Sequence, residues 1–170
     1  MFNRVLIAVI AIFLIASGII YYVLGGFNSP VISIEDKSSV ILYGAAYEGR
    51  YRSDEAEELF YKVRNEQQAI AGSQFVIVSF PTETKDEVSY FIGLSTDSDP
   101  GVEGLREREL KGFTKIIRFK WNKHNLVMPK PFKVKQMAEK MASDNDMQLL
   151  GYTIETYLSE RELQIDFPAK

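Results

Sequence analysis

The sequence predicts an α+β domain, built from two β-α-β-β units in one mainly antiparallel sheet, behind a single transmembrane helix. Three observations lead to this prediction. The chain starts with a long uncharged run, the rest has a globular composition with 46% hydrophobic and 25% charged residues, and the pattern of its first half repeats in its second. We therefore expect a membrane anchor and linker over residues 1–30 and one folded domain over residues 31–170.

The predicted anchor is Val5–Leu24, a run of 20 residues without charge. At about 1.5 Å per residue, a helix of this length crosses the roughly 30 Å hydrocarbon core of a bilayer, and Tyr21 and Tyr22 would lie at its interface. A cleaved signal peptide is the alternative, since Ala16-Ser17-Gly18 could serve as a cleavage site. The apolar run continues beyond that site to Leu24, which favours an uncleaved signal anchor in a single-pass membrane protein.

The charges beside this segment predict its orientation. Arg4 precedes the run, whereas the first basic residue after it is Lys37, which follows Glu35 and Asp36. The positive-inside rule then places the N-terminus in the cytoplasm and the domain on the extracytoplasmic side. The intervening segment, Gly25–Pro30, has the composition of a short linker.

The first unit is expected to begin with a strand over Ser39–Tyr47, which is rich in β-branched and aromatic residues. A helix with an apolar stripe at i, i+3, i+4 spacing follows. Ser53 is a favourable N-cap for it, acidic residues fill its first turn, and Gly72 is a favourable C-cap. The runs Phe75–Phe80 and Val88–Leu94 then predict a β-hairpin.

The segment Thr96–Glu109 is polar, and we expect an exposed connector whose charge run is a solvated surface. The second unit repeats the order of the first. It has a strand over Phe113–Trp121, a helix over Phe132–Ala142, and strands over Tyr152–Leu158 and Leu163–Phe167.

The two halves can be aligned on their closing hairpins. Residues Tyr152–Glu160 match Phe75–Glu83 at an offset of 77, and Leu163–Phe167 match Val88–Ile92 at an offset of 75. An internal duplication is the economical explanation. Two such units side by side place both helices on one face of the sheet and leave a central groove, on the other face or at the seam between the units.

Composition excludes several classes of site. The chain has no cysteine, so disulfides, thiolate metal sites, iron–sulfur clusters and cysteine nucleophiles are ruled out. His124 is the only histidine, and we expect it in a loop, so neither a metal nor another cofactor is predicted. Arg4 is the one charged residue before position 31, so the other 19 basic and 23 acidic residues give the domain a net charge of −4. A nucleic-acid partner is therefore not expected.

The basic segments 118–124 and 130–135 allow three interpretations. Interleaved basic and aromatic residues can bind single-stranded nucleic acid, and lysines beside a membrane anchor can contact anionic lipid headgroups. A mixed solvated surface is the third interpretation, and the sequence of this acidic protein favours it.

Two motifs resemble the gyrase-inhibitor-like (GyrI-like) effector-binding domains. Tyr47-Glu48-Gly49-Arg50-Tyr51 is similar to the turn that leads into the first helix of that family, and Gly151–Tyr157 with Leu163–Pro168 is similar to its closing strands. The resemblance covers about residues 38–169 and implies a duplicated β-α-β-β fold. In that family, the glutamate of the closing Ile-Glu-x-Tyr segment faces the groove and meets cationic or polar ligands, a role that carries over to Glu155. The family includes drug-sensing halves of transcription activators, small-molecule binders, gyrase inhibitors and hydrolases. This chain has a membrane span where many members have a DNA-binding domain.

Glu155 is the leading candidate on physical grounds as well. The equivalent position of the first unit is Val78, so one half carries a carboxylate where the other is aliphatic. Because strand residues alternate between faces, Glu155 and Tyr157 should point to the same side of the sheet. If Ile154 and Leu158 face the helices, then Glu155 and Tyr157 face the opposite side. A buried carboxylate can serve as the counter-ion of a cationic ligand or as a general base. The alternative is a solvated strand residue, or a salt bridge to Lys123 or Arg161.

Aromatic residues are the second group of candidates. Tyr47, Trp121 and Tyr157 could line a groove with Glu155, where rings beside a carboxylate suit a flat cationic ligand. Trp121 lies in a polar context, which favours a partly exposed ring. The alternative for each ring is packing in the hydrophobic core.

These features favour a membrane-anchored domain that binds a cationic or amphipathic small molecule. Two other hypotheses stay open. One is a hydrolase in which Glu155 acts as general base and Tyr47 or Tyr157 donates a proton. The other is an adapter without a ligand, which recruits a protein partner at the membrane.

Overall fold

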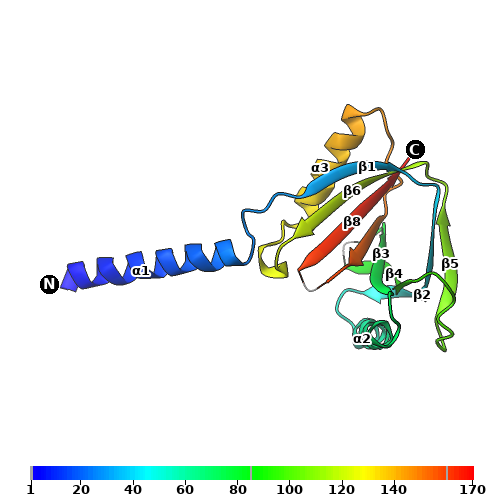
Figure 1. Cartoon of the computed structure of the whole chain (residues 1–170), viewed down its shortest axis with the longest axis horizontal. Coiled ribbons are helices and arrows are strands. Elements are labelled where there is room, and N and C mark those ends of the chain that lie inside the picture. The colour runs from blue at the N-terminus through cyan, green and yellow to red at the C-terminus, as the bar shows by residue number, and fades with distance from the viewer. Residues whose placement is uncertain (1, 85, 160) are drawn as a thin grey trace.

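The computed structural model describes residues 2–84, 86–159 and 161–170 of the chain. Within them, three α-helices, one 3-10 helix and eight strands give an α+β architecture (Figure 1). In chain order, the elements are α1 (Phe2–Val23), β1 (Val31–Asp36), β2 (Ser39–Arg50), α2 (Asp54–Ala69), β3 (Gln74–Phe80), β4 (Glu87–Ser95), β5 (Arg106–Lys111), β6 (Lys115–Asn122), η1 (Asn125–Val127), α3 (Pro131–Asp144), β7 (Thr153–Tyr157) and β8 (Glu162–Ala169).

The predicted duplication is present in the sheet. β2-α2-β3-β4 forms one unit and β6-α3-β7-β8 the other, in a single sheet with the order β1-β6-β8-β7-β3-β4-β2-β5. Every neighbouring pair is antiparallel, which confirms the predicted fold class. The units join where β3 pairs with β7, and there Val78 lies opposite Ile154 and Ile77 opposite Glu155. Glu160, the last position of the sequence alignment, lies outside the described residues.

Two outer strands extend the sheet beyond the expected elements. β5 contains part of the charge run that we expected in a solvated connector, and it pairs with β2, so this expectation is wrong for Arg106–Glu109. β1 pairs with β6 at the other edge. Each of these strands therefore precedes one unit in sequence and pairs with the other. β5 lies at the edge of the sheet, where charged side chains hinder pairing with the strands of other molecules. A strand in this position can therefore have a polar sequence.

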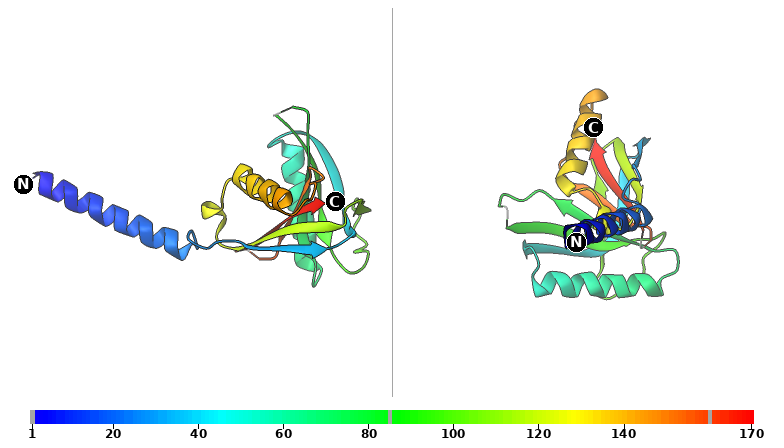
Figure 2. Two further views of the ribbon diagram at one scale, coloured as in Figure 1. Left: turned by 90° about the horizontal axis from the view of Figure 1, so that it is seen from above. Right: turned by 90° about the vertical axis from the view of Figure 1, so that its left-hand side faces the viewer.

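Both helices cover the same face of the sheet, as predicted. Ile77, Glu155 and Ile165 are successive cross-strand neighbours and therefore point to one face. Ile77 packs in the cluster under α2, and Ile165 packs in the cluster under α3. The α2 cluster contains Val63, Phe75, Ile92 and Leu94, and the α3 cluster contains Ile117, Phe119, Trp121, Val134, Ala138, Ala142 and Phe167. Figure 2 shows the two helices apart from each other, with strands between them.

The opposite face holds a third hydrophobic cluster, which includes Leu42, Val78, Ile116 and Ile154. Leu42 and Ile116 belong to β2 and β6, which are far apart in the sheet order, so the sheet curls strongly to bring them into one cluster. Ile154 points into this cluster, so the condition under which Glu155 and Tyr157 would lie opposite the helices is not met. Glu155 and Tyr157 are therefore on the helix face.

The helix α2 begins where the sequence predicts and ends earlier. Ser53 is its N-cap, and the Ser53 Oγ accepts a hydrogen bond from the Ala56 amide at 3.1 Å. The helix ends at Ala69 with Ile70 as its C-cap, so the expected cap at Gly72 is wrong. Gly72 instead supplies a positive φ of 79° in the turn before β3.

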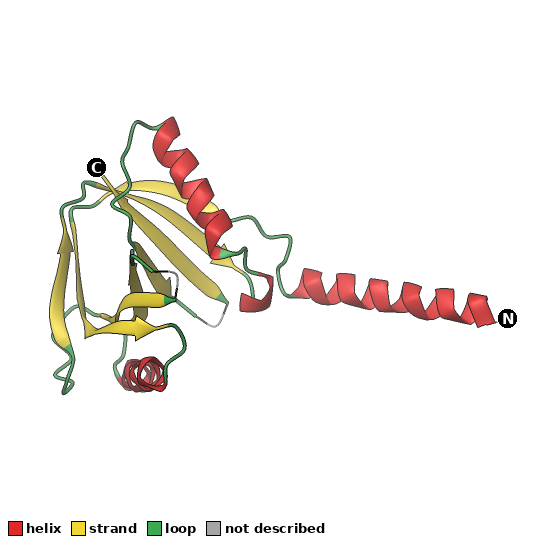
Figure 3. Cartoon of the chain, turned by 180° about the vertical axis from the view of Figure 1, so that it is seen from behind, coloured by secondary structure: helices red, strands yellow, loops and turns green. Residues whose placement is uncertain are grey.

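The helix α1 projects away from the sheet (Figures 1 and 3). Its segment Arg4–Val23 is long and apolar enough to cross a membrane, and none of it is buried against the rest of the described chain. Two hydrogen bonds connect the linker to the domain. The His124 amide donates to the Leu24 carbonyl at 3.0 Å, and the Asn28 side-chain amide donates to the Asn122 carbonyl at 2.8 Å.

Candidate functional site: a groove between the two helices

The helix face is hollowed at the seam between the two units. A cavity of about 350 Å³ lies against α2, a second of about 680 Å³ lies against α3, and Ser79 of β3 lines both. Strands β3 and β7 form the floor between them. The sequence left two places open for the groove, and the structure has a cavity at each, since a third cavity of about 340 Å³ lies on the opposite face beside Leu42, Val76 and Ile154.

Glu155 lies on the floor of the α2-side cavity. The carboxylate has Ile77 as its cross-strand neighbour on β3 and Ile165 on β8, so its surroundings along the floor are apolar. The complete lining is Tyr51, Arg52, Ala56, Glu57, Phe60, Ile77, Ser79, Tyr90, Ile92, Glu155 and Tyr157.

One hydrogen bond to this carboxylate comes from its own strand. The Tyr157 hydroxyl donates to Glu155 Oε2 at 3.4 Å, which is a long hydrogen bond. Within the described residues, no lysine, arginine or histidine forms a salt bridge with Glu155, and this includes the two partners considered from the sequence, Lys123 and Arg161. The site thus holds a partly buried acid without a protein counter-ion.

The titration behaviour follows from this environment. Burial raises the pKa of the Glu155 carboxyl above its ordinary value, and the hydrogen bond from Tyr157 opposes this in part. Burial, followed by the charge of Glu155, raises the pKa of Tyr157. Burial also raises the pKa of Tyr90, with smaller contributions from Tyr51 and Glu155. The phenols therefore keep their protons at neutral pH and act as hydrogen-bond donors.

Aromatic rings form the wall around Glu155. Phe75 connects two of them: its ring centroid lies 4.9 Å from that of Phe60 and 5.6 Å from that of Tyr157. Tyr51 and Tyr90 complete the aromatic part of the lining. A carboxylate on the floor and ring faces on the walls are the groups that attract a flat organic cation.

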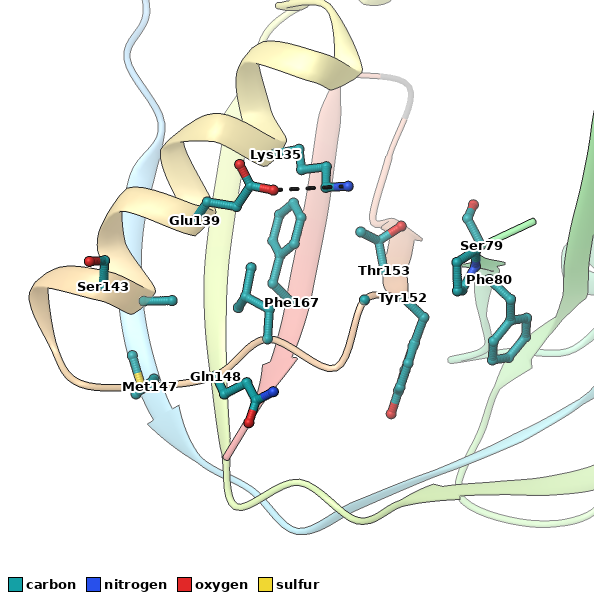
Figure 4. A pocket seen from close by; sticks show the side chains of 14 residues that line it. Ser79, Phe80, Lys135, Glu139, Ser143, Met147, Gln148, Tyr152, Thr153 and Phe167 are labelled. Atoms are coloured by element: carbon teal, nitrogen blue, oxygen red, sulfur yellow. Dashed lines mark ion pairs between the residues drawn. The ribbon is translucent and has the colours of Figure 1, made fainter. Parts of the chain in front are cut away.

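The α3-side cavity is mixed in character (Figure 4). Lys135, Glu139 and Ser143 border it from α3, and the Lys135 ammonium lies 3.9 Å from the Glu139 carboxylate. Thr153 and Phe167 border it from the strands. An apolar interior with a few polar groups at its border suits an amphipathic molecule.

Tyr47 is placed beside the N-terminus of α2 and does not line either cavity. Its hydroxyl donates to the Arg50 carbonyl at 3.0 Å and shares a short hydrogen bond with the N-cap Ser53. Tyr51, the last residue of the same Tyr-Glu-Gly-x-Tyr motif, lines the cavity instead. The motif therefore marks the site, but the residue in contact with the cavity is its second tyrosine.

Trp121 lies in the core under α3, with only 1% of its surface exposed, so the expectation of a partly exposed ring is wrong. Its indole stacks on Phe119 with the centroids 5.6 Å apart. β6 alternates faces, and the polar residues on either side of Trp121 take the other face. A polar sequence context therefore does not show whether a strand residue is buried. His124 lies in a loop, as expected.

Sequence reasoning missed Phe60, Tyr90 and the whole α3-side cavity. Phe60 carried a signal, since it belongs to the predicted apolar stripe of the first helix. Tyr90 belongs to the expected second hairpin strand, where nothing in the sequence distinguishes a residue at the groove from one in the core. The α3-side cavity has no motif, because residues from four elements form it.

No protein-family model matches the sequence, and no curated protein matches it. Solved structures are similar at low identity. SAV2435, in a structure bound to tetraphenylphosphonium, has a TM-score of 0.52 and 16% identity over 82% of this chain and 94% of its own. The EcmrR C-terminal domain has a TM-score of 0.57 and 10% identity over 83% and 98%. A hydrolase from Listeria innocua has a TM-score of 0.54 and 7% identity over 88% and 98%. These likenesses show that the chain shares an α+β fold with these proteins.

Proposed function

We propose that the chain is a membrane-anchored small-molecule-binding protein of the GyrI-like type, and that its ligand is an organic cation or a cationic amphiphile bound in the groove. The observation that carries this proposal is Glu155, a partly buried carboxylate on the floor of a cavity with aromatic walls and no salt-bridge partner among the described residues.

The physical reason is the free energy of an uncompensated charge. An ionised carboxylate in apolar surroundings is unfavourable unless it is paired. A ligand that brings a positive charge to Glu155 supplies that pair, and the faces of Tyr90 and Tyr157 add attraction to a cation. Arg52 and Glu57, both exposed, are also part of the lining, so the groove entrance carries one charge of each sign.

The comparisons with solved structures support an organic cation as the ligand. SAV2435 has been solved with tetraphenylphosphonium, an organic cation with four phenyl rings around its phosphorus, and shares the fold of this chain. The position of Glu155 beneath aromatic rings gives this chain an independent reason to bind such a cation.

Tetraphenylphosphonium is accordingly the first probe. Calorimetric titration of the full chain in nanodiscs, with empty nanodiscs as the blank, should show binding that Glu155→Gln weakens by about 10- to 100-fold, since an interaction with a charged partner contributes roughly 1.5–3 kcal/mol. Neutral triphenylphosphine oxide should bind both forms alike. Glu58→Gln, on the exposed part of α2 outside the lining, is the matched control. Equal affinity of the wild type and Glu155→Gln for the cation would remove Glu155 from the site.

The anchor is the second part of the proposal. α1 has the length and composition of a membrane span and makes no buried contact with the domain, so a bilayer gives its apolar side chains the environment that the domain does not. Arg4 at its start supports a location of the domain on the extracytoplasmic side, by the positive-inside rule. In cells, the full chain should resist extraction by alkaline carbonate, and a protease added outside the membrane should degrade the domain. Release by carbonate would contradict the anchor.

A hydrolase is the second candidate function, and the Glu155–Tyr157 hydrogen bond favours it over an adapter without a ligand. A carboxyl group with a raised pKa can act as a general base toward water, and a protonated tyrosine beside it can donate to a leaving oxygen. Tyr47 is not available for this role because its hydroxyl is engaged at Ser53. Loss of ester turnover in Glu155→Gln with retained ligand binding would favour the enzyme over the binding protein.

A further inference from the structure

The end of the domain that faces α1 carries basic residues and exposed apolar residues. We define the basic loop as residues 123–133, which contain η1 and the start of α3. Figures 1, 2 and 3 show η1 beside the C-terminal end of α1. The His124 amide donates a hydrogen bond to the Leu24 carbonyl at 3.0 Å, which holds the basic loop beside the end of α1. A cavity of about 510 Å³, whose lining includes Tyr21 and Leu126, lies between the basic loop and the last turn of α1.

Large apolar side chains point outward at this junction. Leu126 is 79% exposed and Phe132 is 68% exposed, beside Phe27 of the linker at 72%. These exposed fractions are similar to those of the apolar side chains along α1, where Phe13 is 70% exposed. Clustered exposed apolar groups mark a surface that contacts something other than water.

The same end of the domain is basic. The basic loop contains three lysines and His124 and no acidic residue, although residues 31–170 have a net charge of −4. Lys123, Lys130 and Lys133 line the cavity beside the end of α1. Basic side chains within a few ångströms of a membrane surface are attracted to anionic lipid headgroups, and exposed apolar side chains between them can enter the interface.

We propose that the basic loop is a second membrane contact, which binds anionic phospholipid headgroups through Lys130 and Lys133 and inserts Leu126 and Phe132 into the interfacial region. The inference rests on the proposed anchor, because α1 brings the basic loop to the bilayer. It revises the interpretation of this segment as a solvated surface. The contact adds to the hydrogen bonds from His124 to Leu24 and from Asn28 to Asn122 in setting the orientation of the domain relative to the membrane.

The absence of cysteine from the chain makes a direct test simple. Leu126→Cys in the full chain is labelled with an environment-sensitive fluorophore and reconstituted into vesicles of phosphatidylcholine with 30% phosphatidylglycerol. Because Leu126 is largely exposed, the label does not disturb packing. We expect a blue-shifted emission and quenching by lipids that carry a nitroxide near the headgroup end of the acyl chain. The same label at Tyr61, on α2 far from the basic loop, should emit as in water.

Charge and anchor are tested separately. Lys130→Gln with Lys133→Gln should reduce the quenching at position 126 to the level found in pure phosphatidylcholine, whereas Lys140→Gln should not. A label at Phe13, which the anchor places near the centre of the bilayer, reports the insertion of α1 through quenching by lipids that carry the nitroxide near the methyl end of the acyl chain. If the Phe13 label is quenched and the Leu126 label stays in water, the second contact is refuted and the anchor stands.

If neither label is quenched, the anchor itself fails, and with it this inference. A Leu126 label that is shielded only when a single-stranded oligonucleotide is added would assign the surface to nucleic acid and overturn the proposal.

Discussion

Replacing Glu155 by glutamine should stabilise the unliganded protein, and the gain should depend on pH. Burial raises the pKa of the carboxyl in the folded state above its unfolded value of roughly 4.3. The folded state therefore holds the proton more tightly. The stability that this provides is fully present below the unfolded pKa and is lost as the pH rises through the folded pKa. Glutamine does not titrate, so Glu155→Gln keeps its stability over the same range.

The structure also sets the magnitude of the gain. An unpaired buried polar group costs about 1–3 kcal/mol, and more when it is charged. Glu155 is only partly buried and accepts one long hydrogen bond from Tyr157, which a glutamine oxygen also accepts. We therefore expect a gain of about 1–2 kcal/mol at pH 8 and close to none at pH 4. For a chain of this size, each kcal/mol corresponds to roughly 2–4 °C in the melting temperature.

The assay uses the single tryptophan. Trp121 lies in the core, so its fluorescence reports the unfolding of the domain in detergent or nanodiscs, where α1 contributes no tryptophan signal. Urea unfolding of the wild type, Glu155→Gln and the exposed control Glu58→Gln is compared from pH 4 to pH 8. A difference between the wild type and Glu155→Gln that does not change with pH would refute the reasoning, because it would show that the pKa of Glu155 is the same in the folded and unfolded states, as for a solvated side chain.

Four further substitutions test other parts of the structure by urea unfolding. Arg118→Met should destabilise the folded domain by about 3–5 kcal/mol, because it leaves the buried carboxylate of Asp166 without the guanidinium that contacts it at 2.8 Å. A loss of stability under about 1 kcal/mol would show that this carboxylate is hydrated. Gly44→Ala should destabilise by roughly 1–3 kcal/mol, since the new Cβ would lie 2.3 Å from the backbone oxygen of the facing strand β4; wild-type stability would mean that β2 and β4 separate easily. Tyr47→Phe and Ser53→Ala should each lower the free energy of unfolding by about 1 kcal/mol. The double variant should lose less than the sum of the two, because the two hydroxyls share one hydrogen bond. Strictly additive losses would contradict that contact.

The duplication was predictable because both units repeat the same alternation of apolar and polar residues. Strand alternation also placed Glu155 and Tyr157 on one face, and the structure has both in the same cavity. Which face this is was not predictable from the segment itself, since Ile154 on one side and Tyr157 on the other are both able to pack against a helix. β5 was missed for a related reason, because an edge strand with charged side chains has the composition of a loop.

The sequence by itself determined the uncharged N-terminal run, the two β-α-β-β units and the asymmetry between Glu155 and Val78. These are local properties, since they depend on periodicity, composition and matched positions along the chain. Only the tertiary structure decided that the groove lies between the helices, that Trp121 belongs to the core, and that the basic loop lies beside the end of α1. Each of these depends on contacts between segments far apart in sequence, and the curl of the sheet and the pairing of β3 with β7 set those contacts.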